Sequence, residues 1–254
     1  MIARNISEYI KHIKSITLKN NTINWYRGHA DISWELKPTI WRTFSRENER
    51  GMNHEFLWKA QSRTLNPPLD GDWAEWLSLM QHYRLPTRLL DWSKSPLIGL
   101  YFAIEELILS SKEIESKNDA EVWVLMPGKL NVISGLEPYI FSIKNSTAIE
   151  MIEPAFLSPN KVKENDKIIA VSAIENELRM MVQQSAFTIH SSQEALENYP
   201  ENEKFLKRIK LPKECLNDIA LELDLLGFKP SNIYPDLENL SKEIKIRYQK
   251  LCGI

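Results

Sequence analysis

Apolar residues recur along the chain at two spacings, one typical of helices and one typical of strands. Ile6, Ile10 and Ile13 lie on one helical face, so a helix is predicted over residues 5–15. Residues 22–27 (TINWYR) are rich in β-branched and aromatic side chains and predict a strand. The same criteria predict further helices at 47–64, 72–83, 96–109, 213–226 and 236–251, and further strands at 87–91, 121–126, 167–173, 186–190 and 205–211.

These strands and helices follow one another without a strict strand–helix–strand alternation. We therefore expect an α+β fold, with one or more mixed sheets and flanking helices, rather than a doubly wound parallel sheet. The polar run at 110–119 (SSKEIESKND) is expected to be a linker or a solvated loop. The 254 residues suffice for one large domain with a substantial core.

Composition and charge exclude several classes of function. The net charge of -2 provides no global basic field for nucleic acid or for an anionic membrane. The eight glycines never cluster, so neither a Walker loop nor a G-x-G-x-x-G turn is present. Cys215 and Cys252 lack metal-site spacing and the five histidines are scattered, so no metal site is expected. Because the chain has no long apolar run, we expect a cytoplasmic protein without a membrane partner.

The segment Trp25–His29 (WYRGH) places an arginine and a glycine at the end of an apolar strand. Arg27 supplies a fixed cation, and Gly28 allows the backbone to be approached closely. This arrangement suits a phosphate or a carboxylate. The alternative is an arginine that pairs with an internal carboxylate and holds the fold together.

A second segment, residues 79–93 (LMQHYRLPTRLLDWS), concentrates polar side chains between apolar helices. His82 is a candidate general acid or base because its reference pKa lies near neutrality, although a lone histidine is more often structural. Tyr83, Thr87 and Ser93 are candidate ligand-binding residues. Arg88 is another, and its expected internal ion-pair partner is Asp91. This density of polar groups favours a binding site here.

Four stretches together resemble the FRG domain family, named for its (F/Y)RG motif: YRG at 26–28, QHYRLPTRLLDWSKSPLIGLYFA from residue 81, QQSAFTIH from 183, and LGFKPSNIYPDLENL from 226. The resemblance spans residues 20–240 and implies a single FRG-type domain over residues 1–254, ending in the helix at 236–251. It includes Gln183, which we count among the ligand-binding candidates. Ser185 takes the place of a glycine in the family pattern. The family is defined by sequence, so membership implies no particular activity.

A second resemblance, to arginine-class ADP-ribosyltransferases, suggests a chemistry. Those enzymes carry an Arg-Gly on an early strand, a Ser-Thr-Ser strand leading to a helix, and a Glu-x-Glu before a late strand. Here Arg27 and Gly28, the segment 87–93 and the pair Glu175 and Glu177 occur in the same order, although Ser-Thr-Ser itself is absent. The resemblance implies an ADP-ribosyltransferase-like fold and NAD as a substrate.

On this hypothesis Arg27 binds the NAD⁺ pyrophosphate, while Trp25 or Tyr83 stacks on the nicotinamide. Glu177 stabilises the oxocarbenium ion that develops when the glycosidic bond breaks, and Glu175 activates the acceptor, a protein or a nucleic acid. If residues 175–177 are extended, both carboxylates lie on one face; if they are helical, the carboxylates diverge.

Two other classes of function are consistent with the same residues. The chain can be a regulatory module that holds an anionic ligand through Arg27, Arg88 and aromatic side chains without turning it over. It can also be a nucleic-acid-processing toxin in antiphage defence, in which His82, Tyr83 and Arg84 support acid–base chemistry. Release of nicotinamide from NAD⁺ separates the first hypothesis, an ADP-ribosyltransferase or NAD glycohydrolase, from these two.

Overall fold

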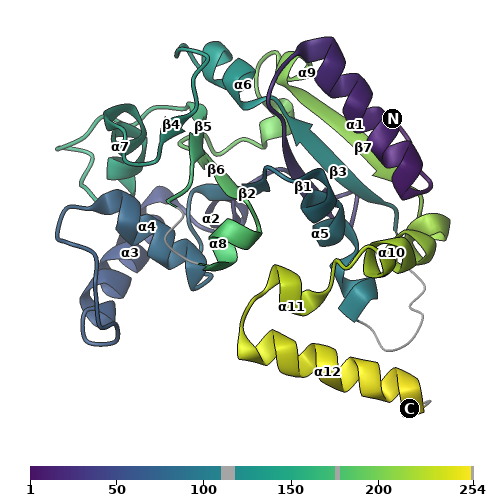
Figure 1. Cartoon of the computed structure of the whole chain (residues 1–254). Coiled ribbons are helices and arrows are strands. Elements are labelled where there is room, and N and C mark those ends of the chain that lie inside the picture. The colour runs from purple at the N-terminus through teal and green to yellow at the C-terminus, as the bar shows by residue number, and fades with distance from the viewer. Residues whose placement is uncertain (110–117, 175–177, 253–254) are drawn as a thin grey trace.

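The computed structural model describes residues 1–109, 118–174 and 178–252. Within them the chain forms α-helices that flank one seven-stranded mixed sheet, so the predicted α+β class is confirmed (Figure 1). The strands are β1 (Trp25–His29), β2 (Leu89–Ser93), β3 (Ala120–Leu125), β4 (Phe141–Ser142), β5 (Ile168–Ser172), β6 (Ser185–His190) and β7 (Leu206–Leu211). The helices are α1 (Ile6–Asn20), α2 (Thr39–Thr43), α3 (Arg46–Ala60), α4 (Trp73–His82), α5 (Pro96–Leu109), α6 (Pro127–Ile133), α7 (Ser146–Ile152), α8 (Leu178–Val182), α9 (Asn202–Phe205), α10 (Leu216–Leu225), α11 (Pro230–Ile233) and α12 (Leu237–Cys252).

Most predicted elements are present, with shifted ends. The strand predicted at 87–91 begins two residues later, as β2. Thr87 explains the shift, because its hydroxyl accepts the Leu89 N–H at 3.1 Å and donates to Gln81 Oε1 at 2.5 Å. Its side chain thus binds the backbone locally before the strand begins. The expected loop at 110–119 lies mostly outside the described residues.

The strand order in the sheet is β4-β5-β6-β2-β1-β3-β7. The pairs are antiparallel except for β4 and β5, which are parallel. Strands β1 and β3 pair along five residues, and β2 and β6 do the same. By contrast, β1 and β2 share only the pair Tyr26 and Ser93. The centre of the sheet is therefore joined at a single residue pair, beyond which β1 and β2 separate.

Helices cover both faces of the sheet and build the core against it. On one face α1, α5 and α10 pack against β1, β3 and β7 around Tyr26, Val122 and Ile209. The opposite face carries a second apolar cluster that includes Trp25, Trp92 and Phe205. A third cluster joins α4 and α7 to β5 and β6. In Figure 1, α11 and α12 lie at one end of the molecule, below α5 and α10.

Helix α5 crosses β1 so closely that the crossing point requires glycine. A Cβ atom added to Gly28 would overlap backbone atoms of Gly99 and Ala103 in α5, and one added to Gly99 would overlap Tyr26. Backbone atoms cannot move aside as a flexible side chain can. The close approach inferred for Gly28 from the sequence is therefore an approach by a helix.

This contact predicts the effect of Gly28→Ala. The added methyl group forces α5 away from β1, so the free energy of unfolding should fall by about 1–3 kcal/mol. Gly51→Ala is the matched control, because it lies in helix α3 with open space around the added atom. That substitution should raise stability by about 0.5–1 kcal/mol. Urea denaturation of both variants measures the two effects, and equal stabilities would contradict this account of Gly28.

Candidate functional site

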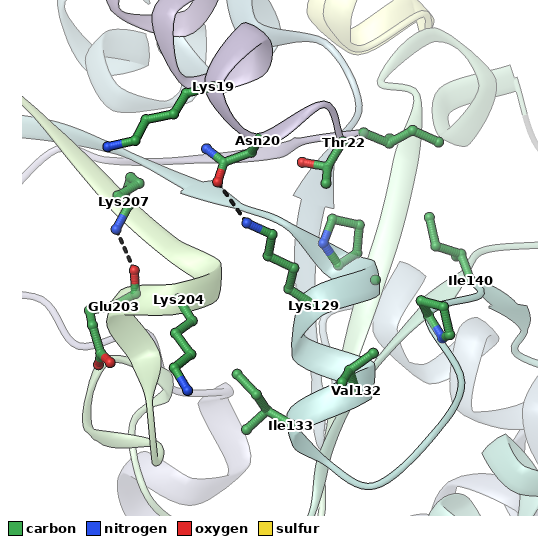
Figure 2. Close-up of a pocket in the computed structure, with 14 residues that line it drawn as sticks. Lys19, Asn20, Thr22, Lys129, Val132, Ile133, Ile140, Glu203, Lys204 and Lys207 are labelled. Carbon is green, nitrogen blue, oxygen red and sulfur yellow. Dashed lines mark hydrogen bonds between the residues drawn. The ribbon is translucent and has the colours of Figure 1, made fainter.

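Two of the cavities in the described part of the chain differ in character. One, of about 690 Å³, lies between α1, α6 and α9 and is lined by none of the residues predicted from the sequence to form a site (Figure 2). The other, of about 370 Å³, opens where β1 and β2 separate. It brings together four of the predicted residues, Arg27, Gly28, Ser93 and Gln183. We call this second cavity the arginine pocket.

Arg27 bridges the gap between the two central strands. Its Nη1 donates to the backbone carbonyl of Asp91 at 2.7 Å, where a complete sheet would have a backbone hydrogen bond. Its Nε donates to His29 Nε2 at 3.3 Å. No ion pair links Arg27 to a carboxylate within the described residues. The hydrogen-bond acceptors that hold its guanidinium group are thus a backbone carbonyl and an imidazole nitrogen.

The electrostatic surroundings of Arg27 agree with this arrangement. Burial lowers the pKa of Arg27, an effect that Asp91 opposes and Arg42 reinforces. The Asp91 carboxylate accepts a hydrogen bond from Gln81 Nε2 at 2.7 Å. Burial also lowers the pKa of His29, against the opposing effect of Glu121. A neutral His29 keeps the Nε2 lone pair that accepts from Arg27.

Two further arginines line the same pocket, and sequence reasoning did not assign either to a binding site with Arg27. Arg84 has a φ of 62°, which turns the chain between α4 and β2. Arg179 comes from α8, with its guanidinium 4.8 Å from the ring centre of Tyr234. Both lower the pKa of Glu105, although burial raises that pKa overall. Among the described residues, three guanidinium groups and one carboxylate, that of Asp91, line the pocket.

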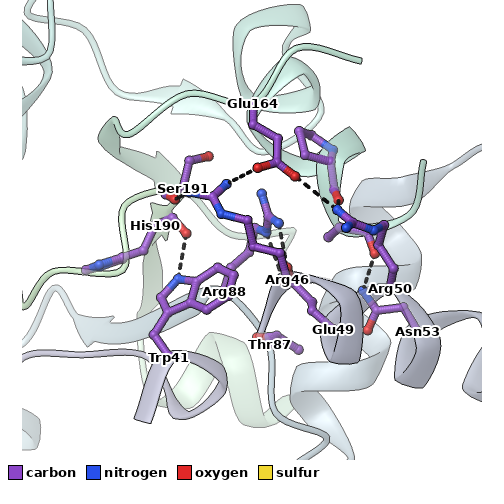
Figure 3. A network of polar contacts seen from close by, with 12 residues as sticks. Trp41, Arg46, Glu49, Arg50, Asn53, Thr87, Arg88, Glu164, His190 and Ser191 are labelled. Atoms are coloured by element: carbon purple, nitrogen blue, oxygen red, sulfur yellow. Dashed lines mark hydrogen bonds and ion pairs between the residues drawn. The ribbon is translucent and has the colours of Figure 1, made fainter. Parts of the chain in front are cut away.

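Arg88 lies in a buried network instead (Figure 3). Its Nε and Nη2 donate to the two carboxylate oxygens of Glu49 at 2.9 and 2.5 Å, and its Nη1 donates to the Met151 carbonyl at 2.8 Å. Both side chains are fully buried. The prediction that Arg88 pairs with Asp91 is wrong. Residues three apart in extended chain point to opposite faces, so the two side chains diverge.

The predicted hydroxyl and amide residues have structural partners. Ser93 Oγ donates to the Gln183 carbonyl at 2.7 Å, which joins β2 to the segment before β6. Gln183 Nε2 donates to the Ile233 carbonyl at 3.1 Å. Thr87 is buried and does not line the arginine pocket. The turn before β6 places its left-handed residue at Gln184, with φ of 48°, so Ser185 needs no glycine-like conformation.

The remaining predicted residues lie outside the pocket or outside the described structure. Tyr83 is 66% exposed and lines a neighbouring cavity, and the His82 ring packs edge-on against it with centroids 4.9 Å apart. Trp25 is buried in the core, so it is not available to stack on a ligand. Glu175 and Glu177 lie outside the described residues.

His190 is a fully buried histidine whose protonation state can be tested through its effect on stability. Burial and the charge of Arg27 lower its pKa to about 3. His190 Nε2 forms a hydrogen bond of 2.8 Å with Thr188 Oγ1, which also accepts from Trp92 Nε1. The folded state therefore holds this histidine neutral.

Because the unfolded chain takes up a proton near pH 6.5 and the folded chain does not, His190 makes stability fall as the pH drops from about 6.5 towards about 3. The slope attributable to it is up to about 1.4 kcal/mol per pH unit. Chemical denaturation at several pH values should therefore show a shallower pH dependence for His190→Asn than for the unmodified chain. Parallel curves would contradict a neutral buried His190.

Within residues 1–109, 118–174 and 178–252, no group of His, Cys, Asp and Glu is arranged to hold a metal ion. None of the helices in these ranges is long and apolar enough to cross a membrane.

A known family model matches part of the chain. No curated protein matches the chain, and no solved structure does. The ADP-ribosyltransferase-like fold thus stays a prediction. The sequence model of the FRG domain matches residues 22–112, which run from the start of β1 past the end of α5 and include Arg27, Gly28, Arg84 and Ser93. The resemblance noted over residues 20–240 is confirmed for this part, and the chain contains an FRG domain at residues 22–112.

Proposed function

We propose that this chain binds a phosphate-bearing nucleotide in the arginine pocket. The observation that carries the proposal is the convergence of Arg27, Arg84 and Arg179 on one cavity in which, among the described residues, Asp91 is the one carboxylate in the lining. Guanidinium groups bind phosphate oxygens through paired hydrogen bonds. The pocket floor adds neutral donors and acceptors from Gln81 and Gln183.

A neighbouring cavity supports a nucleotide over a simple phosphate. It has a volume of about 480 Å³, and its apolar lining includes Phe56, Leu79 and Tyr83. Leu85 lines both cavities, so they adjoin. The exposed Tyr83 ring offers a surface on which a base or a nicotinamide ring can stack. NAD⁺, in which a pyrophosphate joins two ring systems, fits the two adjoining cavities, because its pyrophosphate can occupy the arginine pocket while one ring system lies in the apolar cavity.

Binding is tested most cleanly at Arg84, which is exposed and makes no ion pair within the described residues. Loss of one charged hydrogen-bonding group costs about 1.5–3 kcal/mol, so Arg84→Gln should weaken ADP-ribose binding by about tenfold or more. Arg4→Gln, an exposed arginine outside the pocket, is the control and should bind normally. Isothermal titration calorimetry measures both, and equal affinities would reject the pocket as the binding site.

Cleavage of NAD⁺ is the enzymatic form of this proposal. The site would hold the pyrophosphate while a carboxylate stabilises the oxocarbenium ion, and Glu177 is the proposed carboxylate on the resemblance described above. Glu177→Gln keeps the shape and removes the charge. It should lower NAD⁺ turnover at least about a hundredfold and leave NAD⁺ affinity nearly unchanged. If the unmodified chain binds NAD⁺ but releases no nicotinamide, the regulatory-module hypothesis is favoured.

A further inference from the structure

The cavity between α1, α6 and α9 has a chemistry that the arginine pocket lacks. Within the described part of the chain, four lysines line it (Lys19, Lys129, Lys204 and Lys207), against one carboxylate, that of Glu203 (Figure 2). The chain as a whole carries a net charge of -2, so this lysine cleft is a local excess of positive charge.

Neutral groups hold two of these ammonium groups. Lys129 Nζ donates to Asn20 Oδ1 at 2.6 Å, and Lys207 Nζ donates to the backbone carbonyl of Glu203. Lys19 makes no ion pair within the described residues, whereas Lys204 pairs with Glu201. Three of the four charges therefore lack a carboxylate partner in the described part of the chain. Carboxylates of a ligand can form ion pairs with these three lysines.

The floor of the cleft is apolar and partly exposed. Ile23 is 66% exposed and Val132 is 51% exposed, and Ile133 and Ile140 lie beside them. Apolar side chains grouped in a concavity under a charged rim indicate a surface that a partner covers. The partner must therefore supply both carboxylates and an apolar side chain.

The floor is also preformed. Buried Asn131 holds the loop after α6 in place, since its Nδ2 donates to the Tyr139 carbonyl at 2.7 Å and its Oδ1 accepts the Ala170 N–H at 2.7 Å. A Cβ on Gly128 would approach the Pro138 carbonyl oxygen to 2.7 Å, so helix and loop are in close contact. Preformed surfaces bind without an ordering cost.

We propose that the lysine cleft binds an acidic peptide segment of a partner protein, with an aliphatic side chain seated on Ile133 and Val132. Among the described residues, its lining contains no aromatic ring and no arginine. Single-stranded nucleic acid is held by rings that stack on its bases, and a free phosphate has no apolar part to cover Ile133 and Val132, so both fit this lining less well than an acidic peptide with an aliphatic side chain does. The proposal does not depend on the nucleotide function.

A set of fluorescein-labelled peptides tests it, each with several aspartates and glutamates around one leucine or isoleucine. Two control sets keep one feature only: glycine replaces the aliphatic residue, or asparagine and glutamine replace the acids. Fluorescence anisotropy should show binding of the complete peptides that is at least about tenfold tighter than that of either control and that weakens as salt is added.

Charge reversal locates the site. The double variant Lys19→Glu with Lys204→Glu changes two exposed residues and should reduce peptide affinity at least about tenfold, while Lys14→Glu, exposed on the same helix α1 but outside the cleft, should not. Circular dichroism checks that all variants fold. Three outcomes would overturn the proposal: no complete peptide exceeds its controls, the double variant binds like the unmodified chain, or an oligonucleotide competes for the cleft more tightly than every peptide.

Discussion

Replacing Arg88 by methionine should lower the free energy of unfolding by about 3–5 kcal/mol, the usual cost of removing one partner from a buried ion pair. Glu49 would then keep a fully buried carboxylate without its two guanidinium hydrogen bonds, and the Met151 carbonyl would lose the shorter of its two side-chain hydrogen bonds, keeping that from Ser191 Oγ at 3.4 Å. Loss of the contact between Arg88 and the Trp41 ring, 5.6 Å from its centroid, adds to the effect. Urea denaturation followed by tryptophan fluorescence measures it.

A double variant provides the control for this prediction. Glu49→Leu combined with Arg88→Met removes both charges, so it should be more stable than Arg88→Met alone, because no uncompensated charge remains. The arginine pocket is lined by neither residue. Nucleotide affinity of whichever variants remain folded should therefore be unchanged. A small loss in Arg88→Met, below about 1 kcal/mol, would show that Glu49 finds another partner or takes up a proton.

Replacing Arg27 by lysine should reduce nucleotide affinity by about ten- to a hundredfold, the largest binding effect expected in the pocket. Lysine keeps the charge but loses the planar fork that holds the Asp91 carbonyl, meets His29 and reaches a phosphate at the same time. The stability cost should be modest, about 1 kcal/mol for the lost bond to Asp91. Calorimetric titration with ADP-ribose and a thermal melt without ligand separate the two effects.

A purely structural role for Arg27 predicts the opposite effects on stability and on nucleotide affinity. If this arginine only joins β1 to β2, Arg27→Lys should lower the melting temperature markedly and leave the affinity of the folded protein intact. Ser93→Ala is a suitable comparison. It removes the hydroxyl that donates to the Gln183 carbonyl but leaves the three guanidinium groups in place.

The sequence predicted the elements better than it predicted the contacts between them. Pro96 and the long apolar run after it located α5 to the residue, and the apolar residues of AFTIH located β6 to within one residue. The separation of β1 from β2 has no local signal, since it depends on how distant strands pair. The arginine pocket was accessible to sequence reasoning only in part, through the YRG motif, Ser93 and Gln183.

The contacts that could not be predicted from the sequence join residues that lie far apart in the chain. Arg88 was expected to pair with the nearby Asp91, but its partner Glu49 lies 39 residues away on α3. Arg179 joins Arg27 from the short helix α8, whose sequence carries no pattern that identifies a binding residue. The lysine cleft likewise collects its charges from α1, α6, α9 and β7, which only the fold brings together.

The most direct test of the central claim is a crystal structure of the chain with ADP-ribose. The account predicts the pyrophosphate in the cavity between β1 and β2, with its oxygens within hydrogen-bonding distance of the guanidinium groups of Arg27, Arg84 and Arg179. One ring should lie against Tyr83, across Leu85. ADP-ribose bound elsewhere, or an empty pocket in crystals grown at a concentration that saturates the protein in solution, would contradict it.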